Sequence, residues 1–203
     1  MTPYPDEPWH LAGQMYLSLW PVPRADLPPV AVGTRPVTVA GRGLAGAAWV
    51  VYENDSVLHY GELLRAVLVR DGGRPRVCIT DIWVDSPASM AGGRALWGIP
   101  KEMAVFEAER TDVASFAAKS DDGPLAAARF EERGRLPGRL PLSYRIVQTL
   151  DGRTRTSRVR SRASVRAARA AWTVPSDGRL ADLGRRAPLI SLTLRDFTLS
   201  FGG

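Results

Sequence analysis

The chain has 203 residues, of which 45% are hydrophobic and 24% are charged, a composition ordinary for one globular domain with its own core. No run approaches the roughly 18 apolar residues of a membrane-spanning helix, and the two histidines and the single cysteine show no metal-ligand spacing. We therefore expect one domain over residues 1–203, with no membrane segment, no metal and no cofactor.

The first residues lack the basic-then-apolar order of a signal peptide, and one cysteine excludes an internal disulfide. We therefore expect a cytoplasmic protein. Short β-favouring segments, separated by turns rich in Asp, Asn and Gly, recur along the chain and predict a mainly antiparallel sheet or barrel. The predicted strands are residues 15–20, 48–53, 63–70, 76–84, 105–110, 142–150, 158–166 and 189–199.

Residues 41–46 read G-R-G-L-A-G, which matches the glycine pattern of dinucleotide-binding proteins letter for letter. That pattern binds a pyrophosphate only where a helix follows the glycines. Residues 47–52 favour a strand, so we predict that the glycines serve a turn or a close backbone approach, and no nucleotide site. Further along, Cys78 lies between two apolar residues and is predicted to be a core thiol.

Residues 86–97 interrupt the β pattern and predict a short helix. Asp85 or Ser86 can accept amide hydrogens of the first turn, and Gly98 can adopt the left-handed conformation that ends a helix. Gly92 and Gly93 weaken the helix and would be tolerated mainly where another group packs closely against it.

Lys101 follows that helix, on a loop stiffened by Pro100. All but two of the 27 basic residues are arginines, and the two lysines are Lys101 and Lys119. Since arginine cannot lose its proton near neutral pH, a lysine in such a chain points to a need for an amine. The alternative is an ordinary exposed turn. Apolar residues crowd the position, and burial there would lower the pKa of the amine. They are Trp97, Ile99, Met103, Val105 and Phe106.

The net charge of +6 invites a nucleic-acid interpretation, and much of it lies in residues 153–166. From residue 158 onward arginines alternate with small or apolar residues, which is typical of a strand with one solvated face. No aromatic residue is present to stack on bases. We therefore predict a solvated sheet face or a subunit contact, and no nucleic-acid partner.

Residues 93–101, G-R-A-L-W-G-I-P-K, resemble the segment of the acetoacetate decarboxylase family that ends in its Schiff-base lysine, here Lys101. Residues 60–69 resemble the strand that carries one of its active-site glutamates, here Glu62. The likeness runs from about residue 15 to 201 and is loosest in the C-terminal strands. It implies an antiparallel β-barrel or cone with a short helix before the Pro-Lys loop, assembly into homo-oligomers, and a small-molecule keto substrate.

The chain departs from the family pattern at three places. Glu102 stands where the family has a second lysine, so that burial must activate the amine, or Glu102 points away or acts as an acid–base group. Pro21 stands where the family has its carboxylate-binding arginine. A further family glutamate falls on the apolar residues 48–51, and Glu53 is the nearest substitute.

Three hypotheses follow. The first is a Schiff-base carbon–carbon lyase acting on a small keto acid, with Lys101 as nucleophile and Glu62 in proton transfer. The second is an aldol, dehydration or cyclisation enzyme for a larger, less acidic metabolite, favoured by the missing arginine and the many tryptophans. The third is a small-molecule-binding barrel that has no catalytic turnover. Candidate substrate-binding residues are Arg65, Arg94, Trp97, Trp20 and Glu102.

Overall fold

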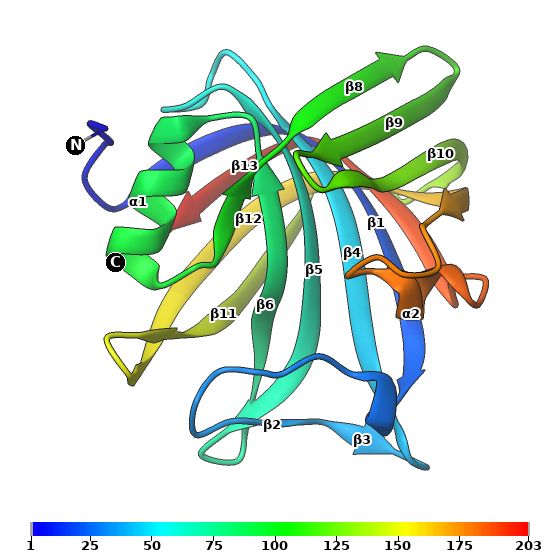
Figure 1. Ribbon diagram of the computed structural model, residues 1–203. Coiled ribbons are helices and arrows are strands. Elements are labelled where there is room, and N and C mark those ends of the chain that lie inside the picture. The colour runs from blue at the N-terminus through cyan, green and yellow to red at the C-terminus, as the bar shows by residue number, and fades with distance from the viewer. Residues whose placement is uncertain (1, 203) are drawn as a thin grey trace.

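The computed structural model describes residues 2–202, and within them thirteen strands join one continuous sheet (Figure 1). The strands are β1 (Trp9–Pro23), β2 (Arg35–Pro36), β3 (Thr38–Val39), β4 (Arg42–Tyr52), β5 (Tyr60–Asp71), β6 (Arg74–Val84), β7 (Lys101–Met103), β8 (Val105–Arg110), β9 (Val113–Ser120), β10 (Gly123–Arg135), β11 (Leu140–Leu150), β12 (Arg153–Thr173) and β13 (Ile190–Phe201). The helical elements are η1 (Arg24–Asp26), α1 (Pro87–Trp97) and α2 (Ala181–Gly184).

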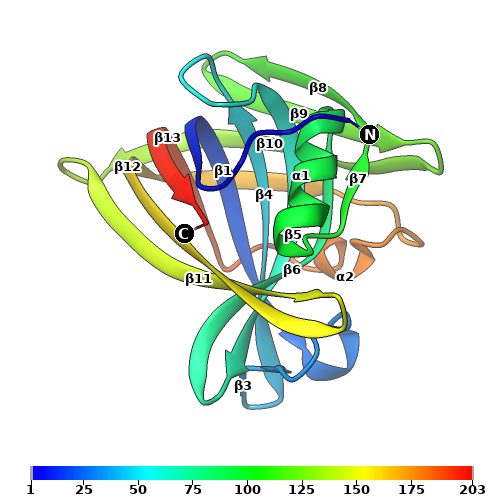
Figure 2. The same cartoon turned by 90° about the vertical axis from the view of Figure 1, so that its left-hand side faces the viewer.

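The sheet curls into a cone. Its main strand order is β11-β6-β5-β4-β1-β13-β12-β10-β9-β8, and nearly all neighbours run antiparallel. β11 pairs with β12 along its whole length but meets β6 only through one parallel pair, Ile146 with Val77. Figure 2 shows β11 and β12 sweeping round toward β6. The predicted mainly β class is confirmed, although the cone is not a strictly closed barrel.

Two hydrophobic clusters lie on the two faces of the sheet, because successive side chains of a strand point to opposite sides. One face, here called the inner face, carries Tyr52, Ile82 and their neighbours, and it is covered by α1 and β11. The other, the outer face, carries Trp49, Leu63 and Trp83 and is covered by β8–β10 and the segment around α2. The central strands β1, β4, β5 and β6 therefore contribute side chains to both clusters.

The predicted helix is confirmed. The Ser86 side chain accepts a hydrogen bond from the amide of Ser89, and Gly98 ends α1 with a φ of 66°. The predicted loop at Lys101 is wrong: Lys101 begins β7, which pairs in parallel with β6. The reason is tertiary, since three residues form a strand only when a preformed neighbour supplies the hydrogen bonds.

The eight predicted strands are present. At the glycine motif only Gly41 lies in a turn, and residues 42–46 already belong to β4. In that strand Gly43 and Gly46 allow the close approach of Leu27 and Leu19, respectively.

β9 and β10 were not predicted, because both are rich in alanine, which has little β preference. The arginine-rich strand is confirmed within β12, where Val159 and Ala163 are buried and Arg160 and Arg162 are exposed. Within residues 2–202 no helix has the length and apolar character to cross a membrane.

Candidate active site

The amine of Lys101 is buried on the inner face, with 5% of its side chain exposed. Its Nζ atom donates hydrogen bonds to Oγ of Ser89 at 2.8 Å, to Oε2 of Glu62 at 2.9 Å and to Oη of Tyr60 at 3.2 Å. These three contacts use all the donors of an ammonium group. Buried lysines are rare and must be paired, so this arrangement marks Lys101 and its three partners as a candidate functional site.

Two strands that flank β6, β5 and β7, and the helix α1 bring these groups together. Tyr60 and Glu62 begin β5 and, being two residues apart, project from the same face. Ser89 lies in the first turn of α1. Gly93 in the same helix allows the lysine stem to pass close by, because an added Cβ would lie 2.8 Å from Cδ of Lys101. The close packing expected of the helical glycines is thus present at the amine.

Tyrosines complete the surroundings of Glu62. Tyr52 donates a hydrogen bond from its hydroxyl to Oε1 of Glu62 at 3.2 Å, and its ring packs on that of Tyr60 with centroids 4.4 Å apart. Burial, opposed by the charge of Lys101 and aided by that of Glu62, raises the pKa of Tyr60 to about 12. Tyr60 therefore keeps its proton at neutral pH and can donate it to an oxygen.

The pKa of Lys101 is raised. Burial lowers it, as the sequence led us to expect, but the carboxylate of Glu62 and the oxygen of Tyr60 outweigh burial and favour the charged amine. The resting site is therefore an ion pair. A lysine in this state becomes nucleophilic only after its proton has been taken up by a neighbouring group.

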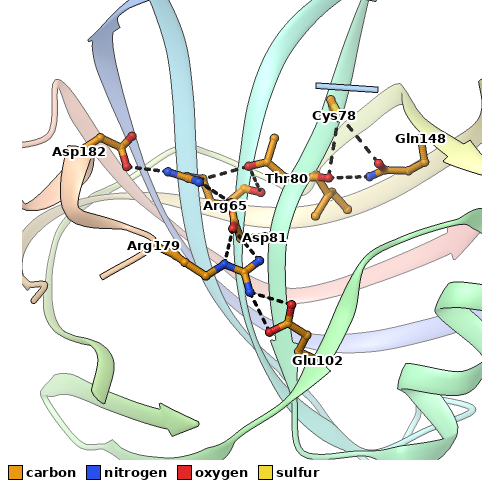
Figure 3. Close-up of polar contacts among 9 residues, drawn as sticks. Arg65, Cys78, Thr80, Asp81, Glu102, Gln148, Arg179 and Asp182 are labelled. Carbon is orange, nitrogen blue, oxygen red and sulfur yellow. Dashed lines mark hydrogen bonds and ion pairs between the residues drawn. The ribbon is translucent and has the colours of Figure 1, made fainter. Parts of the chain in front are cut away.

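Glu102 lies on the outer face, away from the amine. It follows Lys101 in β7, and successive residues of a strand point to opposite sides. Both of its carboxylate oxygens accept hydrogen bonds from Nη1 of Arg179, at 2.7 and 2.8 Å, and Arg179 also contacts Asp81 (Figure 3). Of the roles considered for Glu102, the structure thus supports the one in which it points away.

Arg65 belongs to the same group of charged side chains on the outer face as Glu102, Arg179 and Asp81, here called the outer ion-pair cluster. Its guanidinium donates to Oδ2 of Asp81 at 2.7 Å and to Oδ1 of Asp182 at 2.6 Å (Figure 3), and its side chain is 6% exposed. In β5 it lies three positions from Glu62, hence on the opposite face. The structure does not bring Arg65 to the amine, and its charge is already balanced by two carboxylates.

The other candidates are also separate from the amine. Arg94 is exposed in the last turn of α1. Trp97 is buried on the inner face, where its indole nitrogen donates to Glu7. Trp20 is buried in the hydrophobic cluster of the outer face, and its indole nitrogen donates to the carbonyl of Arg186. Glu53, the nearest substitute for the further family glutamate, contacts Arg110 and Gln14.

Sequence reasoning missed Tyr52, Tyr60 and Ser89. Tyr60 carried a signal, since it lies two residues before Glu62 in a predicted strand and therefore shares its face. Ser89 carried none, because the orientation of α1 over the sheet is not encoded in local sequence. Cys78 is buried as predicted, and burial raises the pKa of its thiol. In the described part of the chain, no group of three or more His, Cys, Asp or Glu is arranged to hold a metal ion.

A family model described as Acetoacetate decarboxylase (ADC) matches residues 34–196, which is well over half of the chain. The chain belongs to the acetoacetate decarboxylase family. No curated protein matches it.

Solved structures of this family share the fold. Acetoacetate decarboxylase from Legionella pneumophila has a TM-score of 0.71 and 15% identity, covering 100% of this chain and 88% of that one. The enduracididine biosynthesis enzyme MppR, complexed with pyruvate, has a TM-score of 0.67 and 21% identity, covering 100% and 90%. An acetoacetate decarboxylase-like enzyme from Sphingomonas wittichii RW1 has a TM-score of 0.66 and 15% identity, covering 100% and 96%.

Proposed function

We propose that this protein is an enzyme that forms a Schiff base between Lys101 and the carbonyl group of its substrate. The observation that carries the proposal is the buried contact of the Lys101 amine with Glu62, Tyr60 and Ser89. A purely structural lysine would be expensive to bury, whereas an amine beside a base and a hydroxyl donor has the groups that imine formation requires.

Glu62 is the proton carrier in this proposal. It accepts a proton from the ammonium of Lys101, which frees the nitrogen lone pair to attack the carbonyl carbon. The carbonyl oxygen takes up the proton that the attacking nitrogen loses as the C–N bond forms, with Tyr60 as hydrogen-bond donor, and a neutral carbinolamine results. Glu62 then returns its proton to the hydroxyl group, water leaves, and a protonated iminium remains. The sum is one ammonium and one carbonyl giving one iminium and one water.

The iminium accepts the electron pair of a breaking bond one carbon away, which is lyase chemistry. If the broken bond leads to a carboxylate, carbon dioxide leaves and an enamine forms. Protonation of the enamine carbon and hydrolysis by water then release a ketone and the free amine. This is the first hypothesis from the sequence, a carbon–carbon lyase acting on a keto acid.

A second reaction is favoured by the contacts of the amine. All three of its partners are oxygen atoms, and one is a carboxylate, so a substrate carboxylate at this position would face Glu62 with the charge of Lys101 shared between two anions. An enamine that adds to an aldehyde, followed by dehydration, needs no such carboxylate. MppR has also been solved in complex with the condensation product of pyruvate and imidazole 4-carboxaldehyde, and joining a keto compound to an aldehyde is the same class of bond formation.

Reductive trapping tests the Schiff base. Wild-type protein is incubated with acetoacetate, pyruvate or acetone and sodium cyanoborohydride, and its intact mass and peptide map are recorded. We expect an adduct on Lys101. The chain offers a matched pair of variants: Lys101→Arg removes the amine and keeps the charge, while Lys119→Arg changes the other lysine, which is exposed. An adduct that persists in Lys101→Arg and maps elsewhere would refute the proposal.

Two expectations of the sequence remain proposals. The family resemblance implies a homo-oligomer, which light scattering of the purified chain measures directly. The single, buried Cys78 agrees with a reducing compartment such as the cytoplasm.

A further inference from the structure

A cavity of about 290 Å³ opens on the inner face, between β1, β4, β5, β6, β11 and β13. Of the side chains that line it none is charged, and Tyr144 alone is polar. We call it the apolar trough and define it by six of its lining residues. They are Leu17, Ala48, Leu64, Ala66, Leu68 and Tyr144.

On β5 the apolar trough ends at Leu64, two residues from Glu62. Glu62, Leu64, Ala66 and Leu68 alternate along β5 and point to the same side. With a rise of about 3.3 Å per residue, Leu64 lies about 7 Å along the strand from Glu62, and Leu68 about 13 Å further. The carboxylate that contacts Lys101 does not line the trough; it lies on the same face of β5, just beyond the Leu64 end, and the apolar side chains lead away from it.

Tyr144 connects the trough to the charged pair. Burial of its hydroxyl and the charge of Glu62 raise the pKa of Tyr144 to about 12, although 38% of the whole residue is exposed. Tyr144 thus lines the trough within the field of Glu62 and is also partly open to solvent. Leu142, two residues earlier in β11, is 37% exposed. These two side chains form an entrance from solvent.

We propose that the apolar trough holds the aryl or alkyl body of an uncharged ketone or aldehyde whose carbonyl group reaches Lys101. This inference rests on the proposed function and names its substrate class. An apolar body gains by leaving water, whereas a carboxylate inside an uncharged lining would lose its hydration without a partner. The volume suits one aromatic ring with a short chain, since it lies just below the range of pockets for drug-sized ligands.

Three carbonyl probes distinguish substrate classes in the trapping reaction. They are 4-phenyl-2-butanone, which is uncharged with an apolar body, acetone, which lacks the body, and pyruvate, which is small and anionic. Each rate is divided by that of Nα-acetyl-lysine with the same probe, which removes differences in intrinsic reactivity. We expect 4-phenyl-2-butanone to modify Lys101 at least about tenfold faster than either of the others, as burial of a ring predicts.

Ala66→Phe fills the trough without touching the amine, and Ala108→Phe makes the same change at an exposed position of β8. We expect Ala66→Phe to abolish the advantage of 4-phenyl-2-butanone and to leave the rate with acetone within about twofold. The control should behave as wild type. Thermal melting verifies that both variants fold.

A second measurement does not depend on any variant. The alcohol 4-phenyl-2-butanol cannot form an imine, and its binding is measured by calorimetry and by competition with acetone trapping. We expect it to bind and to slow the trapping of acetone. Absence of binding would overturn the proposal, as would faster normalised modification by pyruvate or an advantage of the phenyl ketone that survives Ala66→Phe.

The same data separate the two proposals. If no probe modifies Lys101 but the alcohol binds to wild type and not to Ala66→Phe, the Schiff base is refuted and the trough remains a binding site. If acetone and pyruvate modify Lys101 and the alcohol does not bind, the Schiff base stands and the substrate class is wrong.

Discussion

The Nζ atom of Lys101 lies 2.9 Å from Oε2 of Glu62, and about 95% of each side chain is removed from solvent. At this separation the carboxylate acts on the amine in two opposite ways. It holds the ammonium form by charge, and it is also the nearest group that can accept the proton. The same contact therefore delays nucleophilic attack and makes it possible without a water molecule in the site.

Replacing Glu62 by Gln should lower the pKa of Lys101, because the largest influence that raises it is removed and burial then prevails. The rate of acetone trapping, measured from pH 6 to 10, should show its inflection at lower pH than in wild type. Turnover should fall about 10²- to 10⁴-fold, the usual loss with a general base. Glu102→Gln is the matched control on the opposite face, and its inflection should stay in place. An unshifted inflection in Glu62→Gln would contradict the ion-pair assignment.

Replacing Gly93 by Ala should lower the rate of the trapping reaction strongly and the free energy of unfolding only slightly. The added Cβ would lie 2.8 Å from Cδ and 2.9 Å from Cε of Lys101, so the lysine stem must move and carry the amine off Glu62. Alanine is better than glycine in a helix by up to about 1 kcal/mol, which offsets part of the strain. We expect a trapping rate lower by about tenfold or more, since small displacements of reacting groups are costly. Gly134→Ala, which meets nothing within 4 Å, should trap at the wild-type rate.

Replacing Arg65 by Met should destabilise the fold by about 3–5 kcal/mol, because it leaves Asp182 and part of Asp81 buried without a cation. Arg179→Met is the contrast, since that side chain is 46% exposed and Asp81 keeps Arg65. It should cost about 1 kcal/mol or less. Urea denaturation at pH 7 measures both. Equal losses of unfolding free energy in the two variants would show that burial does not decide how much each ion pair of the outer ion-pair cluster stabilises the fold.

The free energy of unfolding should decline above about pH 10. Lys101 and Tyr60 both have a higher pKa in the folded protein than in the unfolded chain, where the values are about 10.4 and 10. Their contribution is therefore complete below those values and is lost as the pH rises through the folded ones. Each group contributes a slope of up to about 1.4 kcal/mol per pH unit. Tyr60→Phe should flatten the decline measured by urea denaturation between pH 9 and 12, and an unchanged slope would contradict the assignment.

Local sequence was sufficient for much of the fold. Ser86 and Gly98 marked the limits of α1 because capping uses neighbouring residues only. The alternating arginines of β12 and the apolar runs of β4 to β6 likewise showed their faces. β7 was not predictable, because its hydrogen bonds come from Ile82 and its neighbours in β6, nearly twenty residues earlier.

The candidate site was predictable only in part. Lys101 and Glu62 emerged from a resemblance in short segments, whereas Arg65 and Glu102 were expected nearby because they are close in sequence. Two residues that are close along a strand point to opposite faces when they are an odd number of positions apart. Ser89 depends on where α1 packs, and the apolar trough depends on the curvature of six strands. Neither is a property of any one segment.

The alternation of Lys101 and Glu102 gives β7 a means of keeping its alignment. Three residues are too few for backbone pairing alone to select one register. A slip by one position would place a carboxylate among the tyrosines of the inner face and an ammonium beside Arg179. The charged partners on the two faces thus favour a single register of β7. The salt bridge of Glu102 with Arg179 on the outer face thereby helps to hold the Lys101 amine in place on the inner face, although the two groups are not in contact.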